Sequence, residues 1–293
     1  MGKVGLVLEG GAFRGIFTAG ALDCLIDEGI RFPYVVGVSA GSGNAINYIS
    51  GQRGRTKKVI THENADPYFG FKPLIKSGKL LNLDTMLDTY CYEQIPFDFD
   101  AFFAADTESE YVAVCCEDGA PAYFDASKEP KRLLQVCKAT CSVPFACSPV
   151  EIDGRHYLDG SVADSVPFER AFEKGCDRAV VILTRKEGDK ATDYSKARLI
   201  AEICYKKKYP KLYDTLMRRS ERYEQQMWAM LNRERAGQLM VIRPTNESIG
   251  HFEGDKAKVE AYYQHGYARM VKRLPELRTF MGVARENAEQ VVG

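Results

Sequence analysis

The chain has 293 residues, of which 45% are hydrophobic and 27% are charged, a balance typical of a globular protein with a substantial core. Its 40 basic and 40 acidic side chains give a formal net charge of zero. Proteins that bind nucleic acid usually carry a basic excess, so the composition argues against nucleic acid as a partner.

Strands and helices alternate in the first 50 residues. The pattern predicts, in order, a strand over Lys3–Leu8, a glycine-rich turn over Glu9–Gly15, a helix over Ile16–Glu28, a strand over Tyr34–Val38 and a helix over Ser42–Ser50. Such alternation is typical of a parallel sheet with helices on both faces. We therefore expect an α/β fold with three α/β/α layers and a mostly parallel central sheet.

The rest of the chain is less regular and richer in helix towards its end. After an irregular stretch over 52–110, the pattern predicts strands at 111–116, 122–124, near 150, 155–158, 179–184 and 239–242, and helices at 131–139, 167–174 and 211–235 and from about 255 and 276. No repeat or linker interrupts the sequence. We expect one domain over 1–293, with a motif-bearing core at 1–185 and a mainly helical part at 186–293 that adds one closing strand.

The most informative turn is Gly37-Val38-Ser39-Ala40-Gly41, which follows a short apolar strand and precedes a helix. A serine at a sharp strand-to-helix turn exposes its hydroxyl above a helix N-terminus, as a nucleophile requires. Glycines on both sides let strand and helix pass closely. The pattern is short, so a tight turn with a bystander serine is the alternative interpretation.

Two further turns follow predicted strands. They are Glu9–Gly15 and Asp159–Ser161, and both are expected at the carboxyl ends of parallel strands. Ligands of open α/β sheets bind at that edge. We therefore expect these two turns and the Ser39 turn to meet in one site.

These three motifs resemble those of patatin-like phospholipases, of the bacterial branch, in order and spacing. The resemblance covers roughly residues 4–185 and implies a serine acyl hydrolase with a catalytic dyad of Ser39 and Asp159. It further implies fatty-acyl ester or phospholipid substrates and neither a metal nor a dissociable cofactor. The residues that it assigns to an oxyanion hole are Gly10, Gly11 and Ala12, and those that support the motifs are Arg14, Gly15, Gly37, Gly41 and Gly160.

The sequence departs from the family pattern at three positions. Ala12 replaces the third glycine of the glycine-rich turn, and Ser161 stands where the family usually has glycine or alanine. Thr140 replaces the serine of a further Ala-Ser-x-x-x-Pro block. Ala12 is a mild change if its N–H still faces the site, whereas Ser161 is a larger one if that position needs a glycine conformation.

The implied mechanism makes a physical demand on Asp159. An ordinary aspartate has a pKa of about 3.9 and accepts a proton poorly at neutral pH. The apolar neighbours Tyr157, Leu158 and Val162 predict partial desolvation, which raises the pKa of a carboxyl group. A dyad also works if the proton moves in concert with nucleophilic attack.

Several charged segments have more than one interpretation. Arg14 either orients the glycine-rich turn or meets an anionic headgroup, or it is a surface residue at a helix start. The basic group at 53–58 either attracts phosphate or forms a solvated loop. The segment Lys206–Arg235 is a lid, a membrane contact or a core helix, and its apolar stripe favours packing. Glu9 is interpreted as a charge at a strand end.

Three rival functions remain open at this stage. A Ser-His-Asp triad would recruit His251 or His265 as the base. A strand followed by Gly10-Gly11 and Gly15 also resembles a dinucleotide-binding turn, although Ala12 breaks the Gly-x-Gly-x-x-Gly pattern. A non-catalytic lipid-binding or partner-binding protein is the third alternative, against which the presence of both Ser39 and Asp159 argues.

Nine cysteines, an odd number in a chain too long to need disulfide staples, predict free thiols in a reducing cytoplasm. Cys137, Cys141 and Cys147 lack the paired spacing of a zinc site, so we expect no metal. No apolar run suits a signal peptide or a membrane span. We therefore expect a cytoplasmic protein that makes at most a transient, peripheral contact with a membrane surface.

Overall fold

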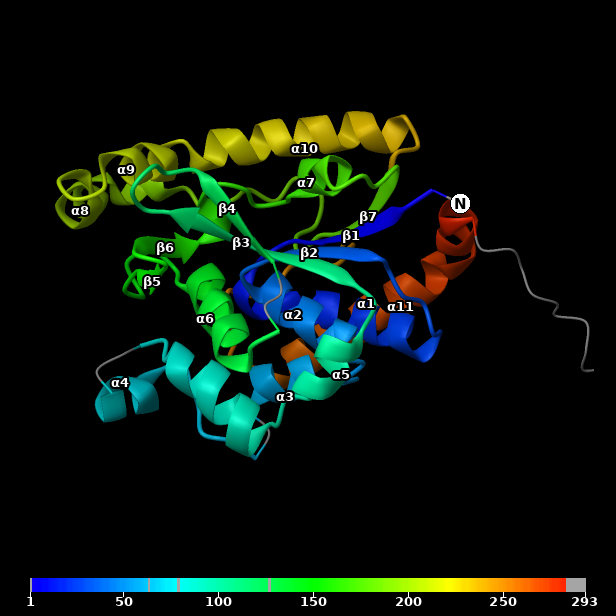
Figure 1. The fold of residues 1–293 in the computed structure, drawn as a ribbon, viewed down its shortest axis with the longest axis horizontal. Coiled ribbons are helices and arrows are strands. Elements are labelled where there is room, and N and C mark those ends of the chain that lie inside the picture. The colour runs from blue at the N-terminus through cyan, green and yellow to red at the C-terminus, as the bar shows by residue number, and fades with distance from the viewer. Residues whose placement is uncertain (1, 63, 78–79, 126–127, 283–293) are drawn as a thin grey trace, which may run out of the picture.

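The computed structural model describes residues 2–62, 64–77, 80–125 and 128–282. Within them an eight-stranded sheet has the order β5-β6-β3-β2-β1-β7-β8, and β4 pairs with β3 (Figure 1). The strands are β1 (Val4–Leu8), β2 (Tyr34–Val38), β3 (Glu108–Cys115), β4 (Pro121–Asp125), β5 (Val150–Ile152), β6 (Arg155–Asp159), β7 (Arg178–Ile182) and β8 (Leu239–Ile242). β1, β2, β3, β7 and β8 pair in parallel, whereas β4, β5 and β6 form antiparallel pairs.

Helices cover both faces of the sheet, which confirms the expected α/β/α layers. The helices on one face are α1 (Gly15–Asp27), α2 (Ala40–Ile49), α3 (Arg55–Thr61), α5 (Phe99–Ala104), α6 (Pro130–Cys141) and α11 (Lys256–Met281), with α4 (Phe71–Ser77) and the π-helix η2 (Thr85–Gln94) further out (Figure 1). Those on the other face are α7 (Phe168–Glu173), α9 (Pro210–Met217) and α10 (Arg219–Arg235), with α8 (Arg198–Ala201) and η5 (Glu202–Lys206) beside them. Leu6 and Leu8 lie in the first core cluster and Val7 in the second, as the alternation of a strand requires.

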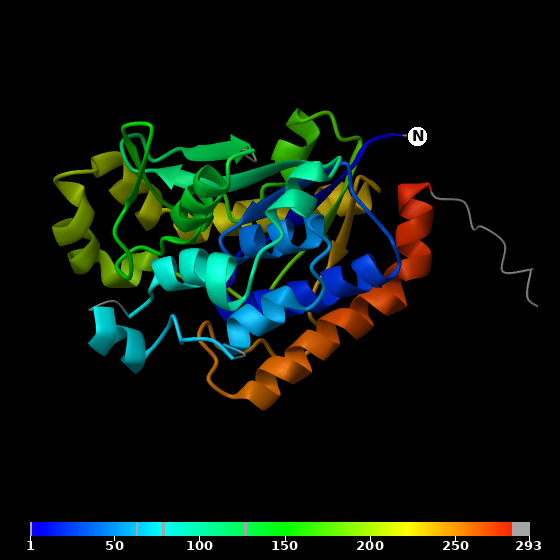
Figure 2. The same cartoon turned by 60° about the horizontal axis from the view of Figure 1, so that its bottom comes forward.

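α11 lies alongside α1 and closes that layer against the sheet (Figure 2). Two glycines let the helix backbones touch. A Cβ on Gly20 of α1 would lie 2.1 Å from the carbonyl oxygen of Tyr263, and one on Gly266 of α11 would lie 2.0 Å from that of Phe17. The C-terminal segment is therefore packed directly on the first βαβ unit.

Two predictions for the C-terminal part are wrong. The single helix expected over 211–235 is broken at Arg218 into α9 and α10. The two helices expected from about Asp255 and Glu276 are one helix, α11, which continues through Pro275 to Met281. Residues 283–293, included in the second of these expected helices, lie outside the described residues.

The packing interpretation of the segment 206–235 agrees with the structure. Tyr223 and Met230 of α10 are buried in the second core cluster, against the sheet. Trp228 lies on the outer side of the same helix and is 70% exposed. Among the described residues, no helix has both the length and the apolar character needed to cross a membrane.

Candidate active site

Ser39 forms the turn between β2 and α2. Its backbone has φ 53° and ψ −124°, a strained conformation for a residue with a side chain. Strand and helix pass so closely that a Cβ on Gly37 would lie 2.7 Å from the carbonyl oxygen of Gly41, and one on Gly41 would lie 2.3 Å from that of Leu8. The two glycines thus have the spacing role predicted for them, and Ser39 stands directly before the N-terminus of α2.

The register of β3 brings Asp159 to Ser39. The first five residues of β3 pair with β2, and the next three pair with β6. Val38 pairs with Val112 and Asp159 pairs with Ala113, so the ends of β2 and β6 meet. The prediction that Asp159 ends a parallel strand is wrong, because β6 runs antiparallel to β3. Asp159 nevertheless lies at the expected edge of the sheet. β3 extends beyond the end of β2, and β6 pairs with this extension, so that β6 ends next to the end of β2.

The hydroxyl of Ser39 donates a hydrogen bond to Asp159, with 2.6 Å between Oγ and Oδ2. The other carboxylate oxygen accepts from the N–H of Ser161 at 2.8 Å. Asp159 is buried, and burial raises the pKa of its carboxyl group above the ordinary value, against the opposing effect of these hydrogen bonds. The desolvation expected for a carboxylate base is therefore present.

The two residues after Asp159 fit the turn without a special conformation. A Cβ on Gly160 would lie 2.1 Å from the carbonyl oxygen of Val112, so the close approach of β3 requires glycine there. Ser161 is not among the described residues with positive φ. Its replacement of the usual small residue is therefore compatible with the backbone.

The glycine-rich turn lies beside Ser39. A Cβ on Gly10 would lie 2.9 Å from the Cβ of Ser39, and one on Gly11 would lie 2.5 Å from Thr184 Oγ1. The hydrogen bonds of the described residues include none from the N–H groups of Gly10, Gly11 or Ala12. Unpaired N–H groups next to a candidate nucleophile are a feature that an oxyanion hole needs.

The backbone of Ala12 is strained, because alanine stands where the family pattern has glycine. Its φ is 50°, in the left-handed region that favours glycine. We expect Ala12→Gly to raise the free energy of unfolding by about 1 kcal/mol. Ala45→Gly in the interior of α2 is the control and should lower it by about 1 kcal/mol. Urea unfolding measures both, and a loss of stability in Ala12→Gly would contradict the assigned backbone strain.

Thr140 of α6 anchors the turn that contains Ser39. Its Oγ1 accepts a hydrogen bond from the N–H of Ser39 at 2.9 Å and donates to the carbonyl oxygen of Val112, and it lies 3.2 Å from Ser42 Oγ. The threonine is fully buried. The family block has serine at this position, and threonine retains the hydroxyl group that forms these hydrogen bonds.

Replacing Thr140 with valine keeps the shape and removes the hydroxyl. The N–H of Ser39 and the carbonyl of Val112 then lose their partner inside the protein, which should lower the free energy of unfolding by about 1–3 kcal/mol. Thr140→Ser is the matched control and should retain most of the stability. Thermal unfolding of the two variants distinguishes the hydroxyl from the methyl group as the stabilising element, and equal losses would refute the anchoring role.

Arg14 is buried at the start of α1, so its interpretation as a surface residue is wrong. Its Nε donates to the carbonyl oxygen of Gly11 at 3.4 Å, and its Nη2 lies 2.7 Å from His251 Nε2. Burial and, to a smaller extent, neighbouring guanidinium groups together lower the pKa of His251 to about 4, so the neutral ring accepts this hydrogen bond at neutral pH. Arg14 thus orients the glycine-rich turn.

The histidines of the rival triad have other partners. His251 is engaged by Arg14, and His265 Nε2 accepts the N–H of Thr245 at 3.1 Å. The side chain in contact with the hydroxyl of Ser39 is the carboxylate of Asp159. Gly15 has a packing role, since a Cβ there would lie 3.0 Å from the Cβ of Ala40.

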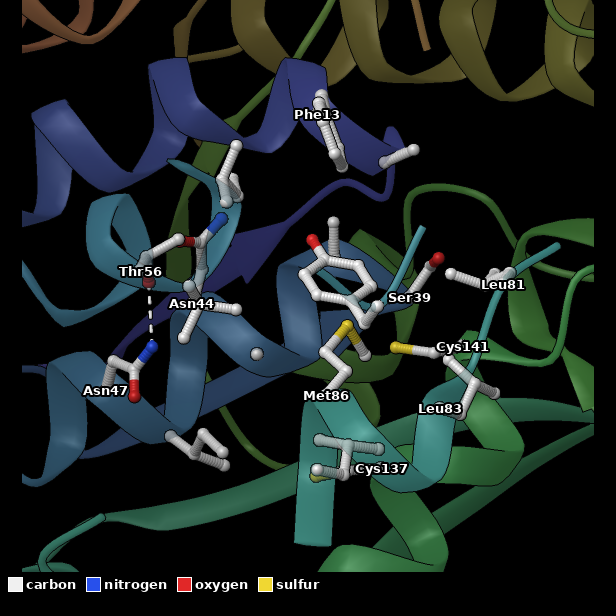
Figure 3. A pocket seen from close by; sticks show the side chains of 18 of the residues that line it. Phe13, Ser39, Asn44, Asn47, Thr56, Leu81, Leu83, Met86, Cys137 and Cys141 are labelled. Atoms are coloured by element: carbon white, nitrogen blue, oxygen red, sulfur yellow. Dashed lines mark hydrogen bonds between the residues drawn. The ribbon is translucent and has the colours of Figure 1, made fainter. Parts of the chain in front are cut away.

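An apolar cavity opens beside Ser39 (Figure 3). It encloses about 880 Å³, part of it open to solvent, and its lining includes Phe13, Ile46, Val59, Leu83 and Met86. Ser39, Gly43 and Asn47 follow one another along α2 at its wall, so the cavity extends about 12 Å from the serine at 1.5 Å per residue. This shape and polarity suit a fatty-acyl chain.

The basic group at 53–58 is not a solvated loop, which corrects one interpretation of the sequence. Arg55 begins α3, is buried, and donates to Asn47 Oδ1 at 2.9 Å and to the carbonyl oxygen of Ile95 at 2.7 Å. Arg53 pairs with Asp27 at 2.7 Å. Arg55 therefore holds the far wall of the apolar cavity.

The sequence predicts no functional role for Glu9, Arg185 or Arg219. Glu9 is fully buried and accepts hydrogen bonds from the N–H of Thr184 at 2.6 Å, from Tyr223 and from Arg185. Arg185 follows β7 at the same sheet edge, which is a signal that the sequence did contain. Arg219 begins α10, and no local pattern marks it.

No group of three or more His, Cys, Asp or Glu side chains in the described parts of the chain is arranged to hold a metal ion. None of the nine cysteines forms a disulfide bond in the described parts of the chain. The chemistry available at this edge is therefore a hydroxyl beside a buried carboxylate, with unpaired main-chain N–H groups next to them.

Comparison with known proteins identifies two family segments. The model of the patatin-like phospholipase family matches residues 6–172, and a domain of unknown function, DUF6363, matches residues 209–282. The uncharacterized protein YjjU of Escherichia coli (strain K12) is 36% identical over 190 residues, which cover 62% of this chain and 52% of that protein. The match thus spans about half the length of this curated relative.

Among solved structures, VipD from Legionella pneumophila has a similar fold, with a TM-score of 0.52 and 14% sequence identity. The similarity covers 94% of this chain and 67% of VipD, and at this identity it concerns the fold alone. The family model covers more than half of the 293 residues and includes the turns of Ser39 and Asp159. The chain therefore belongs to the patatin-like phospholipase family.

Proposed function

We propose that the protein is a serine acyl-ester hydrolase of the lipase or phospholipase type, with Ser39 as nucleophile and Asp159 as base. The observation that carries the proposal is the 2.6 Å hydrogen bond from Ser39 to a buried carboxylate, next to a long apolar cavity. A buried carboxyl group with a raised pKa is a better proton acceptor than an exposed one.

The reaction proceeds in two balanced steps. Ser39 Oγ attacks the ester carbonyl while its proton passes to Asp159, and the proton then goes to the departing alcohol, leaving an acyl-enzyme. A water molecule next gives its proton to Asp159 and attacks the acyl group. The fatty acid leaves, and the proton returns to Ser39.

The developing negative charge on the carbonyl oxygen would be held by main-chain N–H groups of Gly10, Gly11 and Ala12. One such donor typically lowers the barrier by about 3 kcal/mol. The N-terminus of α2, directly after Ser39, adds a favourable positive potential. The acyl chain would occupy the apolar cavity, with its carbonyl group next to Ser39.

The raised pKa of Asp159 sets the pH below which the activity is expected to fall. Ionised Asp159 is the base, so kcat/KM should fall about tenfold for each pH unit below that pKa, which lies above the ordinary value of about 3.9. Arg219 opposes the shift by favouring the ionised form. A pH profile with an uncharged ester measures this limit, and a rate that stays constant down to pH 4 would argue against Asp159 as the base.

Hydrolysis of p-nitrophenyl esters of rising chain length tests the proposal. We expect kcat/KM to increase with acyl length until the apolar cavity is filled, and Ser39→Ala to lower kcat by about 10⁶-fold. Ser195→Ala, on an exposed turn, is the matched control and should keep full activity. Equal activity of the two alanine variants would refute the proposed nucleophile.

We also propose that residues 1–293 act as one domain. The α1–α11 contact joins the segment matched by DUF6363 to the patatin-like segment, and β8 extends the same sheet. Residues of both segments also line the cavities on either side of Asp159 and Ser39.

A further inference from the structure

A second cavity lies on the Asp159 side of the site. It encloses about 820 Å³, part of it open to solvent, and its lining includes Asp159, Arg185, Arg219 and His251. Unlike the apolar cavity, it is lined by charged and polar side chains. Arg219 and His251 both come from the segment matched by DUF6363.

The two cavities meet at the reacting groups. Val143 and Phe252 line both of them, Ser39 lines the apolar one and Asp159 lines the polar one. An ester bound with its acyl chain in the apolar cavity would place its alcohol towards Asp159, which returns the proton to that alcohol. The polar cavity is therefore the leaving-group side of the site.

The arginines of this cavity have unused donors. Arg185 pairs with Glu9, but its buried Nε has no hydrogen-bond partner among the described residues. Arg219 donates to two carbonyl oxygens, of Ser161 and Thr192, each at 2.8 Å. Within the described chain, no carboxylate forms a salt bridge with Arg219.

Two buried guanidinium groups, on Arg185 and Arg219, and two buried carboxylates, on Glu9 and Asp159, line this cavity. A third buried guanidinium group, on Arg14, lies against His251 in the cavity wall. The carboxylate of Asp159 is neutralised whenever it takes the proton of Ser39. A buried charge without a counterion is costly, and an anion that enters the cavity would offset this cost.

The same guanidinium charges affect the pKa of His251. Burial and the nearby charges of Arg14, Arg185 and Arg219 together lower its pKa to about 4. The histidine is thus a neutral member of the cavity wall. Of these guanidinium groups, that of Arg14 contacts the ring, and those of Arg185 and Arg219 line the same cavity as His251.

We propose that Arg185 and Arg219 form a subsite for a phosphate group carried by the alcohol of the ester. The inference rests on the proposed hydrolase function and names the leaving group that the site prefers. A guanidinium group presents a planar fork of N–H donors that matches phosphate oxygens. The oxygens of a phosphate point in several directions, so one phosphate can accept hydrogen bonds from two guanidinium groups at once. The two oxygens of a carboxylate lie in one plane and match a single guanidinium group.

A pair of substrates tests the subsite. The 3-phosphate of 1-dodecanoylglycerol and 1-dodecanoylglycerol itself have the same acyl chain and differ in the phosphate. We expect kcat/KM to be about 10- to 100-fold higher for the phosphorylated ester. Equal values for the two esters would overturn the subsite and leave the hydrolase intact.

Substitutions at neighbouring arginines separate a local from a general effect. Arg219→Gln should lower the preference for the phosphorylated ester about tenfold or more, and Arg219→Lys should restore part of it. Arg218→Gln is the matched control, because this adjacent side chain is 73% exposed and lies on neither cavity. A purely structural role of Arg219 would lower both activities equally, and that result would overturn the proposal.

Competition distinguishes a bound leaving group from free phosphate. Glycerol 3-phosphate should raise KM for 1-dodecanoylglycerol without lowering kcat. Glycerol at the same concentration should leave KM unchanged. Competition by inorganic phosphate alone, with no preference for the phosphorylated ester, would overturn the assignment to the leaving group. Calorimetric titration of the Ser39→Ala protein with glycerol 3-phosphate tests binding without turnover, and absence of binding there would overturn the subsite even if no ester were hydrolysed.

Discussion

Asp159→Asn is expected to lower kcat by about 10²- to 10⁴-fold, the usual contribution of a general base. The asparagine can keep both contacts of the turn, because its oxygen accepts the N–H of Ser161 and its amide donates to Ser39. It cannot take the proton of Ser39. The loss therefore reports the base and not a change of fold.

The same substitution should stabilise the protein at neutral pH. The pKa of Asp159 is raised in the folded state, so the ionised carboxylate lowers stability above that pKa, and this penalty disappears as the pH falls through it. Asp159→Asn lacks the penalty at every pH. Urea unfolding at pH 8 and at successively lower pH should show a stability gain that shrinks once the pH falls through the pKa of Asp159, and a variant less stable than the parent at pH 8 would contradict the burial argument.

Gly266→Ala is expected to lower the free energy of unfolding by about 3 kcal/mol. The added Cβ would lie 2.0 Å from the carbonyl oxygen of Phe17, a backbone atom that can yield only if α1 and α11 separate. Alanine has the higher helix propensity, so the local effect alone has the opposite sign. The substitution therefore measures the packing of the two helices.

Gly43→Ala is the control for this comparison. Gly43 also lies inside a helix, and a Cβ there has no atom within 4 Å, so alanine should raise stability by about 1 kcal/mol. Thermal unfolding of both variants gives the comparison. Stabilisation by both substitutions would show that the C-terminal helix is not pressed against α1 and would weaken the proposal of a single domain.

Much of the fold could be predicted because the first strands are buried on both faces. β2 has the predicted bounds and β1 begins one residue later than predicted, since continuous apolar runs mark buried strands. The edge strand β8 is buried as well and also has the predicted bounds. The turn at Ser39 was recognisable because glycines at fixed distances are needed where strand and helix pass closely. These signals are local and therefore visible in the sequence.

The direction of β6 could not be predicted from its residues. A short strand has the same pattern whether it pairs in parallel or antiparallel, and its direction depends on the extension of β3 past β2. The expected contact between Asp159 and Ser39 is nevertheless present, because it depends on where along β3 the strand β6 ends and not on the direction of β6.

Helix ends in the C-terminal part depended on tertiary contacts. Pro275 is a normal signal for a helix end, but Leu277 is fully buried beyond it, and this burial favours continuation of α11. The break at Arg218 has no proline or glycine to mark it. Arg219, directly after the break, reaches the carbonyl oxygens of Ser161 and Thr192.

The charged part of the site was hidden for a similar reason. Glu9 contacts Arg185 and Tyr223, which are 176 and 214 residues away in the chain. Each of these residues is an ordinary strand-end or helical residue in its local sequence. Only the folded arrangement shows that Glu9 and Arg185 line the cavity on the Asp159 side of the candidate site and that Tyr223 lies behind them in contact with Glu9.

Covalent labelling with a fluorophosphonate probe, followed by peptide mapping, tests the central claim most directly. The account predicts one phosphonylated residue, Ser39, a labelling rate that rises with pH through the pKa of Asp159, and a rate at least 100-fold lower in Asp159→Asn. Labelling at another serine, or an unchanged rate in Asp159→Asn, would contradict the claim that Asp159 activates Ser39.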